Sequence, residues 1–309
     1  MKHNSWVIVV IMLGLMLGAG WLALASLRSA QAEDSGNILY VTLDFNGNCN
    51  TWADGCDMQT ALGKAVAGDQ IWVATGVYTP GITVTDTFHL LDGVAIFGGF
   101  DPASGADEFG ERDWEAFPTV LSGDIGGDDS TDVNGVITTT ANITGTNSFH
   151  VVTGSGLTTT AMLDGFTITA GNAISTTVPN NRGGGMSIDG SNPTLNNLIF
   201  SGNSANSSGG GMYNQNGSPT LTNVTFFGNS ASSGGGMHNS NSSPILTNVN
   251  FNDNSADQGG GMHNDPNSKP TLKDVTFSGN FADEGGGIYN TSSPTLTNVT
   301  FSGNNASVY

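Results

Sequence analysis

Positively charged residues are scarce in this sequence. It contains 7 lysines and arginines against 26 aspartates and glutamates, which gives a formal net charge of −19 at pH 7. Nucleic acids and anionic lipid surfaces attract proteins through clustered basic side chains. We therefore expect neither of these as a partner.

Helix-forming stretches are also rare. A helical repeat needs about ten consecutive good helix formers with apolar residues at a 3.6-residue period, and residues 183–309 contain no such stretch. Charged residues make up only 11% of the chain, which leaves the surface to Ser, Thr, Asn and Gly. Such a composition is compatible with disorder. The apolar residues nevertheless return at fixed intervals, which favours a folded solenoid.

A motif repeats five times within residues 183–309. Each copy has a Gly-Gly-Gly-apolar tetrad, a Ser-Pro, Asn-Pro or Lys-Pro turn, a short apolar strand ending in Phe, and Asn three residues later. The apolar residues after the glycines are spaced by 26, 25, 25 and 26 positions and are Met186, Met212, Met237, Met262 and Ile288. A fixed period of this length indicates stacked supersecondary units that bury their apolar faces against one another.

The second copy indicates what one unit is. Its apolar residues fall in three groups, at 211–213, 219–221 and 224–226, separated by turn residues. Val224 and Phe226 share one face of a strand, but Leu221 lies three positions before Val224, so residues 222–223 must contain a bend. We predict three short strands around a triangle. Copies stacked about 4.8 Å apart would pair strand on strand in parallel, which is a parallel β-helix.

Stacking in this way places equal residues above one another. Met, Leu, Val, Phe and Ala columns would fill the interior. Asparagines would form ladders because an amide both donates and accepts hydrogen bonds. One ladder is the position three residues after each Phe, with Asn203, Asn229, Asn254, Asn280 and Asn304. The other follows the glycine strand, with Asn214, Asn239, Asn264 and Asn290.

The paired halves Gly-Gly-Gly-Met and Phe-Ser-Gly-Asn resemble the polymorphic outer membrane protein repeat, although a third Gly stands where Ala is usual. They are also similar to repeats of secreted bacterial β-helix proteins of the pectin-lyase-like superfamily. Earlier segments resemble coils of those proteins, namely residues 67–74, 76–78, 98–100, 112–114, 121–127 and 163–168. The resemblance implies an all-β fold, a right-handed parallel β-helix.

The first 32 residues have the pattern of an export signal. Lys2 and His3 precede an apolar run over residues 6–25, and Ala30-Gln31-Ala32 fits a cleavage site before Glu33. We expect cleavage, but twenty apolar residues can also remain as a membrane anchor. Either way the chain is exported, and it would contact a membrane only through this segment. We expect a secreted or cell-surface protein of a bacterial envelope.

Cys49 and Cys56 are the only cysteines. In an exported chain they are expected to form one small disulfide loop. Two free thiols are the alternative.

Residues 33–182 are predicted to hold an N-terminal cap and irregular coils of the same domain as residues 183–309. Runs at 38–45, 70–78, 88–100 and 161–169 have the character of strands. A short helix lies between the first two, and it would cover the first coil. Its predicted N-cap is Asp57, its closing residue Gly68, and its apolar face Met58, Ala61, Leu62 and Ala65.

The densest acidic segment, residues 124–132, is a candidate calcium site. Its carboxylates are Asp124, Asp128, Asp129 and Asp132, and its glycines would let them converge. The segment lacks the spacing of an EF-hand, so a solvated turn is the other interpretation. No cofactor is otherwise expected.

His238 and His263 occupy the same repeat position, between Tyr213 and Tyr289. Stacked one coil apart, the two imidazoles could bind a metal, but the sequence indicates no third ligand. Strand alternation favours an outward Tyr and His ladder instead.

The pectin-lyase-like resemblance raises polysaccharide lyases and glycoside hydrolases as candidate functions. Lyases need several basic side chains in one groove, and removal of Lys2 and Arg28 with the signal leaves only Lys64, Arg112, Arg182, Lys269 and Lys273. The Gly-His-Gly and Arg-x-Lys elements of polygalacturonase-like enzymes are absent. We therefore favour a non-catalytic, adhesin-like scaffold that binds extracellular glycans or other surface proteins. A carbohydrate-active enzyme is the alternative.

The sequence stops at Tyr309, where the next glycine tetrad is due. An uncovered last coil would expose strand edges and favour end-to-end self-association. A fragment of a larger anchored surface protein is the other expectation.

Overall fold

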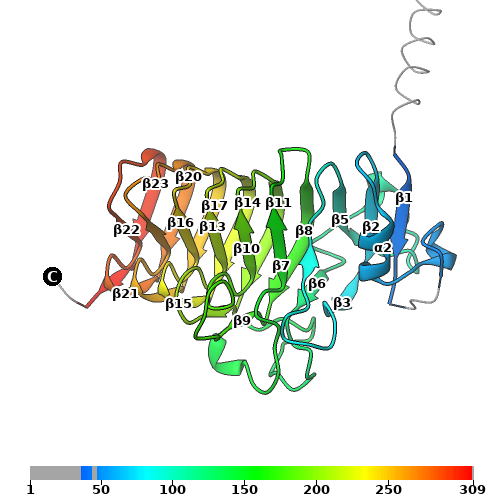
Figure 1. Cartoon of the computed structure of the whole chain (residues 1–309), viewed down its shortest axis with the longest axis horizontal. Helices are drawn as coiled ribbons and strands as arrows, with labels where there is room; N and C mark the ends of the chain where they lie inside the picture. The colour runs from blue at the N-terminus through cyan, green and yellow to red at the C-terminus, as the bar shows by residue number, and fades with distance from the viewer. Residues whose placement is uncertain (1–35, 44–46, 308–309) are drawn as a thin grey trace, which may run out of the picture. The chain divides into compact units, whose positions relative to one another are not determined.

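Successive coils of the chain pair strand on strand in three parallel sheets (Figure 1). The structure is a computed structural model that describes residues 36–43 and 47–307. Residues from Ile38 onward form one unit, and the predicted signal segment, residues 1–32, lies outside the described residues. The right-handed parallel β-helix predicted from the sequence is confirmed. Among the described residues no helix has the length and hydrophobicity to span a bilayer.

The largest sheet runs the length of this unit. Its main path is β1 (Ile38–Val41), β2 (Gln70–Ala74), β5 (Ala95–Phe100), β8 (Met162–Thr169), β11 (Thr194–Ser201), β14 (Thr220–Phe227), β17 (Ile245–Asn252), β20 (Thr271–Ser278) and β23 (Thr295–Ser302). Beside this path, β3 (Gly76–Tyr78) pairs with β6 (Thr119–Ser122), which pairs with β8.

Two smaller sheets form the other two sides of the regular coils. The second contains β4 (Phe88–His89), β7 (Val152–Ser155), β10 (Met186–Asp189), β13 (Met212–Gln215), β16 (Met237–Ser240), β19 (Met262–Asn264) and β22 (Ile288–Asn290). The third contains β9 (Asn172–Ala173), β12 (Ser204–Ala205), β15 (Ser230–Ser233), β18 (Ser255–Gln258), β21 (Phe281–Glu284) and β24 (Asn305–Ala306).

The prediction of which residues form the three sides was partly wrong. Residues 219–221 and 224–226 were assigned to separate strands, but β14 continues through both. The expected bend is a single residue, Asn223, whose φ of 56° lies in the left-handed region. This residue resets the alternation, so that Leu221 and Val224 both reach the core. The third side of the coil is instead β15, which carries Ala231.

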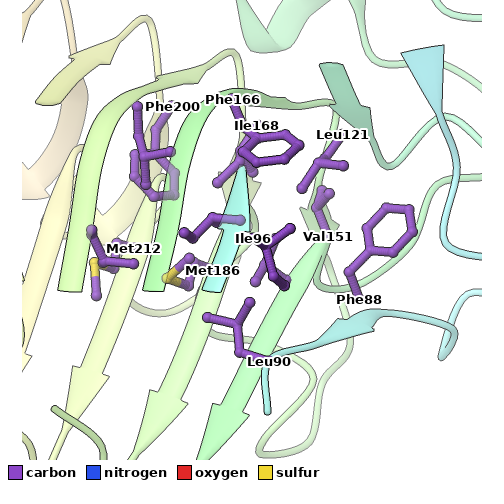
Figure 2. Close-up of a cluster of buried hydrophobic side chains, with 14 of the residues drawn as sticks. Phe88, Leu90, Ile96, Leu121, Val151, Phe166, Ile168, Met186, Phe200 and Met212 are labelled. Carbon is purple, nitrogen blue, oxygen red and sulfur yellow. The ribbon is translucent and has the colours of Figure 1, made fainter. Parts of the chain in front are cut away.

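The predicted apolar columns form the interior. Met186, Met212, Met237, Met262 and Ile288 pair in register, and Figure 2 shows Met186 beside Met212. The Phe200 and Phe226 rings stack with centroids 4.8 Å apart and planes 6° apart, and the stack continues through Phe251 to Phe301. One continuous core cluster extends from Leu39 to Phe277.

The Asn203 to Asn304 ladder is also confirmed. Asn254 is fully buried and donates from Nδ2 to Asn280 Oδ1 at 3.0 Å and to the Phe226 carbonyl at 2.9 Å. Its Oδ1 accepts from the backbone N–H and the Nδ2 of Asn229. Each inner asparagine therefore satisfies a turn carbonyl, an amide N–H and the next asparagine. The second ladder links Asn214, Asn239 and Asn264.

The backbones of adjacent coils approach one another closely at the Gly-Gly-Gly segments. A Cβ on Gly235 would lie 2.4 Å from the Ser255 carbonyl oxygen and 2.7 Å from that of Gly260. Neither backbone oxygen can move without breaking a coil contact. Only glycine fits here, which is the role expected for it between stacked coils.

The N-terminal helix forms where it was predicted, but it is shorter. Helix α2 (Met58–Lys64) begins after Asp57, whose Oδ1 accepts from the Thr60 N–H at 2.8 Å. It buries Met58, Ala61 and Leu62 and contacts β1, β2 and β4 at the N-terminal end (Figure 1). The helix ends before Gly68, since Ala65 already has extended backbone angles.

Other segments before the regular coils differ from the sequence-based assignment. The run at 70–78 divides into β2 and β3, and the run at 88–100 divides into β4 and β5. Gly76 and Gly93, with φ of 139° and 75°, stand at these breaks. Within the described residues, three short 3₁₀ helices occupy loops, at Trp52–Asp54, Phe109–Glu111 and Thr140–Asn142. A disulfide joins Cys49 to Cys56 beside β1.

Candidate functional site

The acidic loop after β6 is organised around the carboxylate of Asp124. Its Oδ1 accepts from the backbone N–H of Gly127 at 2.7 Å and of Asp128 at 3.2 Å. Its Oδ2 accepts from the Asp129 N–H at 3.3 Å. These bonds turn the chain back on itself and bring carboxylate oxygens of Asp124, Asp128 and Asp129 within 4.8 Å of one another.

Asp129 is partly buried and contacts a second segment of the chain. It accepts from the Thr144 N–H at 2.6 Å and from Asn147 Nδ2 at 2.7 Å. Partial burial raises the pKa of Asp129 above its usual value, and the neighbouring Asp124 and Asp128 charges add to the rise. Converging carboxylates under mutual repulsion suit a hard cation such as Ca²⁺. Calcium binding by this loop stays a prediction.

Asp132, the fourth predicted ligand, is not part of the group. Its Oδ1 accepts from the backbone N–H of Asn134 at 2.8 Å and of Val136 at 2.9 Å. Asp132 therefore stabilises the next turn of its own loop. Sequence spacing could not distinguish an aspartate of the carboxylate group from one that stabilises a turn, because all four aspartates within these nine residues suit such a turn.

The second candidate site lies on the outer side of the second sheet. His238 of β16 pairs in register with His263 of β19, and their rings stack with centroids 4.6 Å apart and planes 11° apart. Tyr213 and Tyr289 continue the stack at 5.4 Å and 5.0 Å. The predicted Tyr and His ladder is confirmed, although His238 and His263 are buried.

A third polar group, which the sequence reasoning missed, faces both histidines. Asp265 follows β19, and its Oδ1 lies 3.5 Å from His238 Nε2 and 3.6 Å from His263 Nδ1. Strand alternation could have indicated it, because residues 263 and 265 share a face. It was missed because this position holds no column of equal residues: the other regular coils have Asp189, Gln215, Ser240 and Thr291 there.

The protonation states within this cluster follow from its surroundings. Burial lowers the pKa of His263 to about 4, and His238 adds to the decrease while Asp265 opposes it. The polar contact with His238 is the main cause that lowers the pKa of Asp265 to about 2. Near neutral pH the cluster therefore offers a neutral His263 imidazole and an ionised Asp265 carboxylate.

A pocket of about 300 Å³ lies at the N-terminal end of the same ladder. Arg182 covers the Tyr213 ring at 5.2 Å, and its Nη1 donates to the Tyr213 hydroxyl at 3.0 Å. That hydroxyl donates to Gln215 Oε1 at 3.1 Å. The lining residues are Val178, Pro179, Arg182, Ser187, Ile188, Asp189, Tyr213 and Gln215. An aromatic ring with several polar groups around it suits a polar ligand.

A second, more acidic pocket lies on the third sheet. It has a volume of about 280 Å³ and is lined by Ser232, Ser233, Asp257, Gln258, Asp283 and Glu284.

Arg112 has a structural role. Its Nη2 lies 2.6 Å from Asp164 Oδ1, and its Nε donates to the Gly98 carbonyl at 2.9 Å. Its guanidinium also lies over the rings of Phe97 and Phe109. These contacts fasten the loop between β5 and β6 to the large sheet.

The chain has recognisable relatives at the level of fold. Residues 134–306 match the family described as the right handed beta helix region. No curated protein sequence matches the chain significantly.

Solved structures similar to it include three enzymes that act on pectic polysaccharides, as their names state. They are pectate lyase Pel9A (12% identity, TM-score 0.44, 89% of this chain and 77% of that one), rhamnogalacturonan lyase (12%, 0.40, 87% and 63%) and pectin methylesterase PemA from Erwinia chrysanthemi (9%, 0.38, 80% and 70%).

Proposed function

The chain belongs to the right-handed β-helix family, and on that premise we propose that it is a non-catalytic scaffold that binds a glycan or another surface protein. Export to the cell surface or the extracellular space is part of this proposal and rests on the pattern of residues 1–32. The Gly-Gly-Gly-Met and Phe-Ser-Gly-Asn halves support repeats of the polymorphic outer membrane protein type.

The main support is how inward and outward positions differ in the regular coils. Inward positions repeat with little change and are fully buried in the coils before the last one, as at Leu246, Val249 and Phe251. Outward positions vary between coils, as where Lys273 pairs with Thr247. The recurring residues are thus accounted for by packing and hydrogen bonding, and the outer surface is left for binding.

The basic residues give further support. Arg112 is engaged by Asp164 and Arg182 by Tyr213, while Lys64 donates to the Asn48 carbonyl at 3.0 Å. These side chains belong to different segments of the fold. A lyase mechanism needs basic groups gathered around one substrate carboxylate.

The pocket at Arg182 and Tyr213 is the proposed glycan contact. Asp189 and Gln215 line it beside the Tyr213 ring, so hydroxyl groups of a sugar would find both acceptors and donors there. Loss of a hydrogen bond to a charged group typically weakens binding about tenfold.

A glycan array probed with the purified chain tests this proposal. We expect binding to one class of oligosaccharide, with Asp189→Asn and Gln215→Ala each weakening it about tenfold. Asp257→Asn, in the acidic pocket of the third sheet, is the control and should bind like the wild type. Equal binding by all three variants would rule out the Arg182 pocket.

One observation favours the enzymatic alternative, namely the raised pKa of Asp129 beside Asp124 and Asp128. A carboxyl group with a raised pKa can act as a general acid. Incubation with pectin and alginate would decide, because turnover that is lost in Asp129→Asn would replace the scaffold proposal with a carbohydrate-active enzyme.

A further inference from the structure

We propose that His238, His263 and Asp265 form a binding site for one divalent transition-metal ion, with Zn²⁺ as the reference ion. Two imidazole nitrogens and one carboxylate oxygen are a donor set that such ions accept, and three protein ligands leave a position for water. The site goes beyond the proposed glycan binding and does not depend on it.

The distances fit a shared ion better than a set of hydrogen bonds. Asp265 Oδ1 lies 3.5 Å from His238 Nε2 and 3.6 Å from His263 Nδ1. Hydrogen bonds from nitrogen to oxygen are usually near 2.9 Å. Ligand bonds to Zn²⁺ are about 2.0–2.2 Å, so two tetrahedral ligand atoms lie about 3.4 Å apart. Both measured separations are close to that edge length.

Burial gives an independent indication. The side chains of His238 and His263 are only 8% and 9% exposed. His263 Nδ1, which faces the Asp265 carboxylate, has no hydrogen-bond partner among the described residues. A buried polar nitrogen without a partner is unfavourable, and a metal ion between it and Asp265 would satisfy it.

Binding requires a small rotation of the rings. The candidate ligand atoms lie within 4.8 Å of one another, and the stacked rings are nearly parallel, 11° apart. Lone pairs of parallel rings cannot converge on one ion, so at least one imidazole must turn about its side-chain torsions. The strands can stay in place, because His238 and His263 are already in register.

The experiment is a Zn²⁺ titration of the full-length chain by calorimetry after chelator treatment, with excess Ca²⁺ present to occupy other carboxylates. We expect one ion per chain and shifts of the His238 and His263 ring proton resonances. His263→Tyr should weaken Zn²⁺ binding at least tenfold. Tyr stands at this position in neighbouring coils, as Tyr213 and Tyr289, so the stack should remain and the variant should fold.

Two further variants make the result decisive. Asp265→Asn should weaken Zn²⁺ binding, and His89→Ala, at an exposed histidine of β4, should leave it unchanged. Equal affinity of the wild type and His263→Tyr, or ring resonances that do not move with Zn²⁺, would mean that the three residues are a structural ladder only. The glycan array measures neither Zn²⁺ affinity nor the shifts of the histidine ring resonances. The metal-site proposal and the glycan-binding proposal can therefore fail separately.

Discussion

At the residue scale, the asparagines three positions after each Phe hold the coils together where apolar contacts cannot. Asn254 makes two donor and two acceptor bonds to coils above and below while fully buried. The amide matches a backbone carbonyl, a backbone N–H and another amide at once, and no other uncharged side chain of that length does so. Identical asparagines can therefore be stacked along the whole helix.

Asn254→Ala should be among the most destabilising single substitutions in this chain. It leaves the Phe226 carbonyl, the Asn229 N–H and two asparagine side-chain groups without these partners, each at a cost of about 1–3 kcal/mol. We expect a loss of about 3 kcal/mol or more in the free energy of unfolding, measured by urea denaturation. Asn304→Ala, at the partly exposed last position of the ladder, is the control and should cost less. Similar losses in both would show that burial does not determine how much a position of the ladder contributes.

At the scale of the element, one residue with left-handed backbone angles bends each long strand of the large sheet. A single strand therefore covers the stretch in which the sequence predicted two. Asn197, Asn223, Asn248, Asp274 and Asn298 all have φ between 50° and 56°, within the region that Asn and Asp tolerate best among non-glycine residues. Neighbouring strands skip this position together in their pairing. The ladder therefore continues on either side of it.

Helix α2 depends on its N-cap residue, Asp57, because it has only seven residues. Asp57→Ala removes the bond from the Thr60 N–H to Asp57 Oδ1, and the expected loss is about 1 kcal/mol in the free energy of unfolding. Asp57→Asn should keep most of that stability, since Asn caps a helix about as well as Asp. Equal destabilisation by the two substitutions would contradict a capping role.

The sequence predicted the elements whose residues repeat. Met186 to Ile288 and Asn203 to Asn304 stand at one period, so their stacking followed from period and chemistry alone. The boundary between the second and third sides did not follow, because an asparagine that bends a strand and one that ends it look alike in sequence. Asp265 was missed for a related reason, since its position varies between Asp, Gln, Ser and Thr in the regular coils and forms no column of equal residues.

At the scale of the whole molecule, each regular coil contacts mainly its neighbours. Such solenoids have stabilities that are sums over coils and their interfaces. Met212 pairs with Met237 and Met237 pairs with Met262 in the same register. One coil can therefore take the place of the next without a change in the register of strand pairing.

Deletion of residues 237–261, one complete coil, should thus leave a folded protein. Met212 would pair with Met262, and the urea m-value should fall by about a tenth because less surface is exposed on unfolding. Deletion of residues 237–249, about half a coil, removes the register and should abolish cooperative unfolding. Circular dichroism with urea melts distinguishes these outcomes, and an unfolded 237–261 deletion would contradict nearest-neighbour stability.

The parallel register also determines how the chain can fold in time. Each strand of the regular coils finds its partner about one repeat back along the sequence, as Val249 finds Val224. Contacts of constant, modest sequence separation keep the entropy of loop closure the same for every coil added. A chain that is synthesised or exported with its N-terminus first can therefore add coils one at a time to those already formed. The folding of one coil does not require residues that lie further along the chain.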